Sequence, residues 1–138
     1  MIDIENDVFD YVCTKIEEAH PGVSVDGEYA DLPAELPAVS IAEKSNSVFE
    51  RMRTRNIENA VRVMYEAVVF SGKMDGKREE AKAILKTMDK AFLDLGFTRT
   101  MQNNVPNFRD ASIIRIISRY EAIVAPTNDG KYMIYHNY

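Results

Sequence analysis

The chain has 138 residues, a single cysteine and a formal net charge of −5. This length fits one domain that can bury a core without disulfides or metals, and a single cysteine excludes an intramolecular disulfide. The acidic balance gives no basic surface for general nucleic-acid binding. Because the N-terminal segment lacks the parts of a signal peptide and no apolar run is long enough to cross a bilayer, we expect one cytoplasmic domain, residues 1–138, without a membrane segment.

Two segments carry the period of an amphipathic helix. In residues 3–19 apolar side chains recur every three or four positions, with Asp3 placed as the N-cap and Pro21 placed to end the pattern. Residues 75–95 carry the clearest helical period of the chain, and Gly96 follows as a stop. The apolar stripe of this second helix consists of Ala81, Ile84, Leu85, Met88, Phe92 and Leu95.

The other regular segments alternate or are rich in β-branched and aromatic residues, which is typical of strands. We expect strands at residues 23–29, 38–43, 61–70, 97–100, 111–125 and 131–138. Prolines predict an extended connector over residues 31–38, and turn residues predict a loop over 101–110 and a hairpin turn at 127–130.

A polar insertion, residues 44–58, has no sustained period and predicts a projecting loop or hairpin at about residues 45–59. It carries Arg51, Arg53 and Arg55 at alternate positions. If this segment is extended, all three arginines lie on one face, where they can meet phosphate or an acidic protein surface. A solvated loop is the alternative interpretation.

Together these elements predict an α+β fold, in which two helices pack on one face of a mainly antiparallel or mixed sheet of about five or six strands. The other face of the sheet would mix charged and apolar side chains, too apolar for a solvated surface and too charged for a core. It would be either a half-wet surface with cross-strand ion pairs or a subunit interface. Its predicted members are Arg62, Met64, Glu66, Val68, Phe70, Arg115, Ile117, Arg119, Glu121 and Ile123.

Few side chains have the spacing of a catalytic or ligand-binding motif. His20 and His136 are isolated from each other in sequence, so a histidine metal pair is not expected. The segment Ser71-Gly72-Lys73 lacks the spacing of a phosphate-binding loop and indicates a turn. We therefore expect no enzymatic activity and no cofactor.

Acidic residues gather where the second helix is expected to begin, at Asp75, Glu79 and Glu80. Acidic residues favour this position because the helix dipole attracts negative charge. A metal-dependent nuclease site built on these carboxylates is the alternative interpretation.

Several segments, in collinear order through most of the chain, resemble a family of small tail proteins of long-tailed bacteriophages. These are the tail terminators, also called tail-completion or head–tail joining proteins. The resembling segments are Glu28-Tyr29, Leu36-Pro37-Ala38-Val39-Ser40-Ile41, Glu58-Asn59 leading to Val63-Met64-Tyr65-Glu66, Gly96-Phe97-Thr98-Arg99, Pro106-Asn107, and Arg115 through Arg119-Tyr120.

The resemblance implies a homo-hexameric ring that caps the tail tube and joins the tail to the head. It implies no enzymatic activity, and a central channel through which DNA passes without specific binding. The implied partners are further copies of the chain, the major tail tube protein and the head-completion or connector protein. The implied locations are the host cytoplasm during assembly and the tail–head junction of the virion. The family has no short functional motif that transfers to single residues.

Interface positions are therefore predicted from the residue pattern alone, in the polar insertion and on the second face of the sheet. They are Arg51, Arg53, Arg55, Arg62, Met64, Phe70, Arg115 and Arg119. Three other functions stay open: a head-side stopper or adaptor of the connector, a small nuclease using Asp75 with Glu79 or Glu80, and a nucleic-acid-binding module built on the three arginines of the insertion.

Overall fold

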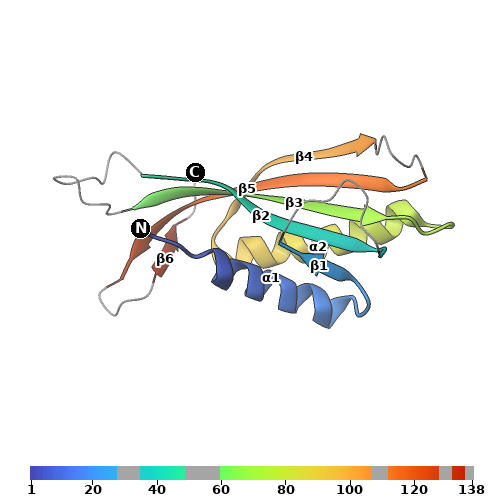
Figure 1. Cartoon of the computed structure of the whole chain (residues 1–138), viewed down its shortest axis with the longest axis horizontal. Coiled ribbons are helices and arrows are strands. Elements are labelled where there is room, and N and C mark those ends of the chain that lie inside the picture. The colour runs from blue at the N-terminus through green and yellow to red at the C-terminus, as the bar shows by residue number, and fades with distance from the viewer. Residues whose placement is uncertain (28–34, 49–59, 107–111, 128–131, 136–138) are drawn as a thin grey trace.

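The computed structural model describes residues 1–27, 35–48, 60–106, 112–127 and 132–135. The described residues form two helices and six strands, and both helices lie on one face of the sheet (Figure 1). This confirms the predicted α+β fold. In chain order the elements are α1 (Glu5–Ala19), β1 (Ser24–Asp26), β2 (Ala38–Val48), β3 (Val61–Ser71), α2 (Lys77–Leu95), β4 (Thr98–Pro106), β5 (Ile114–Pro126) and β6 (Tyr132–Tyr135).

The sheet is mixed but mainly antiparallel, with the strand order β1-β2-β3-β5-β4. Only the β1–β2 pair is parallel among the described strands. The long strand β5 pairs with β3 along one side. Along its other side it pairs first with β4 and then, nearer its C-terminal end, with β6. One strand therefore holds three others in place.

The main core lies between the sheet and the two helices. Alternate residues of β3 and β5 point into it, and each helix contributes its apolar stripe. The predicted stripe of α2 is confirmed, since Ala81, Ile84, Leu85, Met88 and Phe92 are all buried and Leu95, half-buried, packs against them. On the other side of that helix the charged side chains of Lys82, Lys86 and Lys90 stay exposed.

Four aromatic rings, three from α2, β3 and β5 and one from Phe97 just before β4, meet at the centre of this core. Phe92 stacks on Tyr120, with ring centroids 4.2 Å apart and ring planes 7° from parallel. Phe97 presents its edge to Phe92 at 5.5 Å and to Tyr65 at 5.4 Å. The Tyr120 hydroxyl donates to Asp89 Oδ1 at 2.9 Å, and Arg99 Nη1 donates to the same oxygen at 3.1 Å. This cluster fixes α2 against the sheet.

Both helices begin two residues later than their patterns predict. The N-cap of α1 is Ile4 rather than Asp3, and the Asp3 carboxylate instead accepts the backbone N–H of Glu5 at 3.0 Å. Helix α2 begins after Gly76, which has φ +82° and so cannot belong to a right-handed helix.

No helix in the described part of the chain is both long and apolar enough to span a membrane.

The stop at Gly96 is confirmed. Its φ of +104° suits glycine, and the Gly96 and Phe97 N–H groups bond the carbonyls of Leu93 and Phe92. A side chain at Gly96 would also lie 3.1 Å from the backbone oxygen of Ile134 on β6. The glycine therefore ends the helix and admits the last described strand.

Two strands are longer than their patterns predict. The polar insertion begins later than residue 44, because β2 continues to Val48 and its residues Ser45–Val48 pair with Val61–Met64 of β3. The paired ends of β2 and β3 extend past the start of α1 (Figure 1). The predicted loop at 101–110 is likewise wrong as far as Pro106, because β4 pairs with β5 up to that residue. In both cases hydrogen bonding to a neighbouring strand overrides a polar sequence.

Smaller differences affect the remaining strands. Of the strand predicted at 23–29, the structure shows Ser24–Asp26 as β1, and residues 28 and 29 lie outside the described residues. The strand predicted at 111–125 begins at Ile114 and ends at Pro126. Of the strand predicted at 131–138, β6 covers Tyr132–Tyr135. The hairpin turn predicted at 127–130 lies, beyond Thr127, outside the described residues.

We predict that Phe92→Ala lowers the free energy of unfolding by about 3–5 kcal/mol, because it removes a fully buried ring from the aromatic cluster. Its neighbour Leu93 is 46% exposed and offers a matched control, so Leu93→Ala should change stability by less than about 0.5 kcal/mol. Urea denaturation followed by circular dichroism measures both. Equal losses in the two variants would contradict the assignment of the core.

Candidate functional site

The sheet face opposite the helices, called the open face below, is formed mainly by alternate residues of β3 and β5. Both strands show the predicted alternation, since the residues between these positions point into the main core. The cross-strand pairs of the open face are Arg62 with Ile123, Met64 with Glu121, Glu66 with Arg119, Val68 with Ile117 and Phe70 with Arg115.

One end of the open face is closed, which corrects the expectation for Phe70. Val68 and Phe70 are each only 1% exposed, and they pack with Ala38 and Ile113 in a second, smaller core. Phe70 therefore stabilises the monomer and is not available to a partner in this structure. Arg115, which lies opposite it, is half-buried.

An ion pair occupies the centre of the open face. Arg119 Nε donates to Glu66 Oε2 at 3.1 Å, from directly opposite positions on β5 and β3. The Glu66 side chain is 15% exposed and the Arg119 side chain 44% exposed, so water screens the pair from one side. A cross-strand ion pair, which belongs to one of the two interpretations left open for this face, is therefore present, and the subunit interface stays a prediction.

The other end of the open face mixes apolar and charged side chains at intermediate exposure. Met64 and Ile123 supply apolar surface, and Arg62 and Glu121 flank them. All four are half-buried. Apolar side chains with a charged border are typical of a surface that associates with a partner. This end and the partly exposed Arg119 side chain are therefore the described parts of the predicted interface that stay accessible.

Arg51, Arg53 and Arg55 lie outside the described residues, as does His136. The other histidine, His20, is at the end of α1, where its Nε2 lies 2.8 Å from Thr87 Oγ1 of α2. It thus links the two helices.

The carboxylates at the start of α2 are not drawn together. Asp75 and Glu79 are exposed, while Glu80 Oε1 accepts a hydrogen bond of 2.7 Å from the buried Ser71 hydroxyl. Glu80 therefore holds the end of β3 against α2. Within the described part of the chain, the oxygens of these three carboxylates do not converge on one point, as the ligands of a metal ion would.

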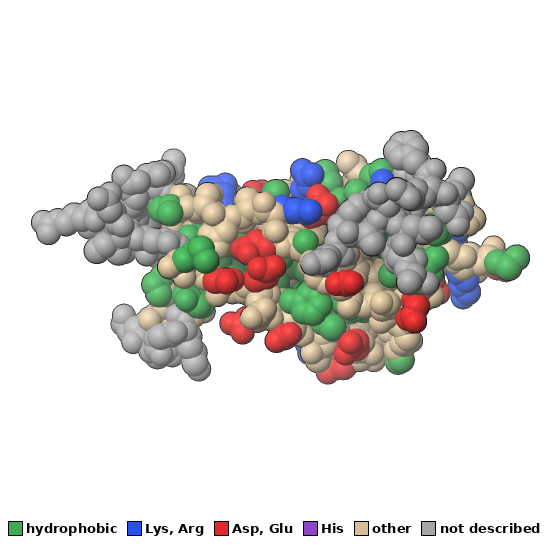
Figure 2. All heavy atoms as spheres, in the orientation of Figure 1, with side chains coloured by type: hydrophobic (Ala, Val, Ile, Leu, Met, Phe, Trp, Pro, Cys, Tyr) green, Lys and Arg blue, Asp and Glu red, His purple; other side chains and the backbone are tan. Residues whose placement is uncertain are grey.

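A different set of carboxylates does converge, and the sequence pattern did not indicate it. One oxygen from each of Asp3, Glu5 and Glu43 lies within 4.8 Å of the other two. Asp3 and Glu5 stand at the start of α1, and Glu43 comes from β2. Figure 2 shows acidic side chains gathered over this part of the surface. Burial, followed by the negative charges of Glu5 and Asp3, raises the pKa of the Glu43 carboxyl.

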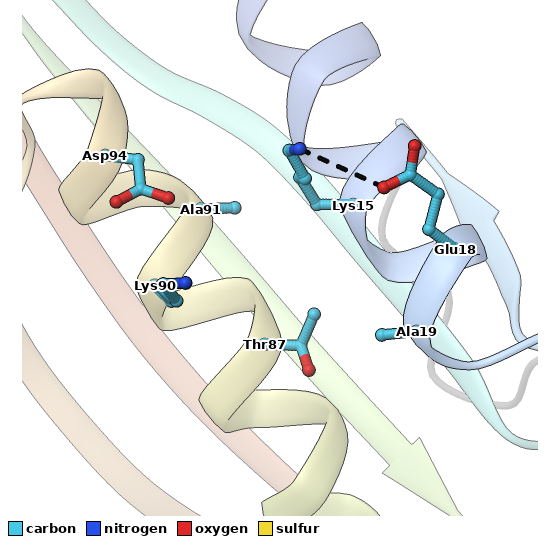
Figure 3. Close-up of a pocket in the computed structure, with 7 residues that line it drawn as sticks. All are labelled: Lys15, Glu18, Ala19, Thr87, Lys90, Ala91 and Asp94. Atoms are coloured by element: carbon cyan, nitrogen blue, oxygen red, sulfur yellow. Dashed lines mark ion pairs between the residues drawn. The ribbon is translucent and has the colours of Figure 1, made fainter.

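A groove of about 380 Å³ lies between the two helices (Figure 3). Lys15, Glu18, Lys90 and Asp94 on its walls are exposed. Lys15 Nζ lies 3.9 Å from Glu18 Oε2 on the same helix. Charged side chains of both signs in contact with water are typical of a solvated seam between helices rather than a ligand site. Its full lining is Lys15, Glu18, Ala19, Thr87, Lys90, Ala91 and Asp94.

The chain matches no protein-family model, and no curated protein matches it significantly.

We predict that the Glu66–Arg119 pair contributes modestly to stability. A double-mutant cycle with Glu66→Ala, Arg119→Ala and the double variant should give a coupling energy of about 0.5–1 kcal/mol, because the arginine is partly exposed. Urea denaturation at low and high salt measures it. The coupling should shrink at high salt; a coupling of zero at low salt would show that the ion pair does not stabilise the open face.

Proposed function

We propose that this chain is a structural assembly protein, a phage tail terminator. Copies of the chain form a ring, hexameric by the resemblance, that caps the tail tube and joins the tail to the head. The proposal gives the protein no catalytic role and no cofactor. Its partners are further copies of itself, the major tail tube protein and a connector protein on the head side. Its final location is the tail–head junction of the virion.

The open face is the observation that carries this proposal. Two of the segments that resemble the tail terminators fall on it: Val63-Met64-Tyr65-Glu66 lies on β3, and residues 115–120 lie on β5. Half of the side chains in these segments fill the core, and the other half form the open face. The same two strands therefore build the monomer and present the surface that we assign to assembly.

A ring requires each copy to use two different patches, because head-to-tail contacts around an axis are heterologous. We assign the accessible end of the open face, around Met64 and Ile123, as one patch. The arginine-bearing insertion stays the predicted contact with a neighbour or with the tail tube. The net charge of −5 supports a channel that lets DNA pass, since an acidic wall does not hold phosphate.

We predict that Met64→Lys weakens self-association at least tenfold, or about 1.4 kcal/mol, because it places a charge in the apolar part of the patch. The new lysine would stand opposite Glu121, an arrangement that favours the folded monomer. Light scattering and negative-stain microscopy, with and without the tail tube protein, measure the assembly.

The matched control is Ala83→Lys, which adds the same charge at an exposed position of α2 on the other side of the molecule. It should leave ring formation unchanged. Circular dichroism should show both variants folded. A wild-type chain that stays monomeric and binds no tail tube protein would contradict the proposed function, and binding to a head-side connector alone would favour the stopper or adaptor instead.

A further inference from the structure

The convergent carboxylates lie beside a small cavity that the proposed function does not use. The cavity has a volume of about 220 Å³. It lies between the first turn of α1 and the sheet, and its lining includes Glu5 and the buried Tyr65. The remaining lining residues are Asn6, Phe9, Gly27 and Ile41.

Tyr65 is the second, independent sign of a ligand at this place. Its side chain is 1% exposed, yet its hydroxyl has no hydrogen-bond partner. A buried hydroxyl normally has one, because leaving it without a partner costs about 1–3 kcal/mol. Glu43 Oε1 is also buried without a partner. Glu43 and Tyr65 are directly opposite each other on β2 and β3, so both side chains lie on the helix side of the sheet, where Tyr65 and Glu5 line the cavity.

The electrostatic surroundings make this arrangement costly without a positive charge. Desolvation raises the pKa of the Tyr65 phenol first, and then the charges of Glu43, Glu5 and Asp3 raise it further. The phenol therefore lies within electrostatic range of all three carboxylates. No Lys, Arg or His lines the cavity among the described residues.

We propose that Asp3, Glu5 and Glu43, together with the Tyr65 hydroxyl, bind a hard divalent cation, and we assign calcium as the preferred ion. All four donors are oxygens, which hard cations prefer, and no thiolate or imidazole takes part. Oxygens that share a calcium ion at about 2.3–2.6 Å lie at most about 5 Å apart. The three carboxylates already meet this limit, with one oxygen from each within 4.8 Å of the others.

The neighbouring contacts support a built site. Asn46 Nδ2 donates to the backbone oxygen of Ile2 at 2.8 Å, which holds the segment before α1 against β2. The Asp3 carboxylate also accepts the N–H of Glu5 and so orients the start of the helix. A bound cation would join the start of α1 to β2 and β3 by direct ligation. Calcium should therefore raise the melting temperature.

Terbium luminescence tests the site directly. The chain has seven tyrosines and no tryptophan, so tyrosine is its sensitiser. Terbium, which occupies calcium sites, should luminesce on tyrosine excitation of the wild-type chain, and calcium should displace it. Tyr65→Phe should greatly weaken the signal, because it removes a sensitiser that is also a proposed ligand. The matched control Tyr11→Phe, at a half-buried position outside the cavity lining, should retain it.

Calorimetry then measures the affinity. We expect a dissociation constant for calcium on the order of 10⁻⁴ M, at least tenfold weaker binding in Glu43→Gln, and unchanged binding in Asp10→Asn, which neutralises an exposed carboxylate of α1. Glu43→Gln should fold, since it relieves repulsion among the carboxylates, and a urea denaturation in chelator checks this.

Three results would overturn the proposal: no displaceable terbium signal together with no heat from millimolar calcium, magnesium or manganese; equal affinity in Glu43→Gln; or equal weakening in Asp10→Asn, which would mean non-specific attraction to an acidic protein. Displacement of terbium by magnesium at a lower concentration than by calcium would overturn the assignment of the ion.

Discussion

The stacking of Phe92 on Tyr120 is the contact on which the rest of the structure depends. It joins the last turn of α2 to β5, the strand that holds β3, β4 and β6. Because Phe97 and Tyr65 close around these two rings, α2 cannot rotate without breaking several aromatic contacts. The same packing immobilises the ring of Tyr65, whose hydroxyl is then fixed beside the start of α1. Core packing thus sets the position of the Tyr65 hydroxyl in the small cavity beside Glu5.

Much of the fold could be predicted from the sequence because most elements bury one face only. Apolar periodicity identified both helices, and alternation identified which side chains of β3 and β5 enter the core. The pattern failed where a strand is polar on both faces, in Lys44–Val48 and in the second half of β4. There the strand forms because a neighbour supplies hydrogen-bond partners, and that neighbour is distant in the sequence. Helix starts were misplaced because local turns, such as the one at Gly76, decide them.

The candidate sites were predictable only where a local pattern determines them, and not where residues distant in the sequence come together. Alternation in the two strands placed Glu66 and Arg119 on the same face, but their direct opposition depends on the pairing and register of β3 and β5, which the sequence did not indicate. The burial of Phe70 depends on Ala38 and Ile113, which approach it only in the folded chain. The acidic cluster brings residues 3 and 5 together with residue 43, and no local spacing reveals such a meeting. The arginines of the insertion have a visible pattern, but they lie outside the described residues.

The bulge between Glu43 and Ser45 in β2 has a consequence for how this chain can change in evolution. The extra residue, Lys44, shifts the alternation of the strand by one, so that Asn46 rather than Ser45 faces the helices and can bond Ile2. Deleting one residue here would invert the orientation of every later side chain of β2, up to Val48, whereas adding or deleting two would preserve it. Insertions and deletions at this point should therefore contain an even number of residues. An alignment of related sequences would show whether they do.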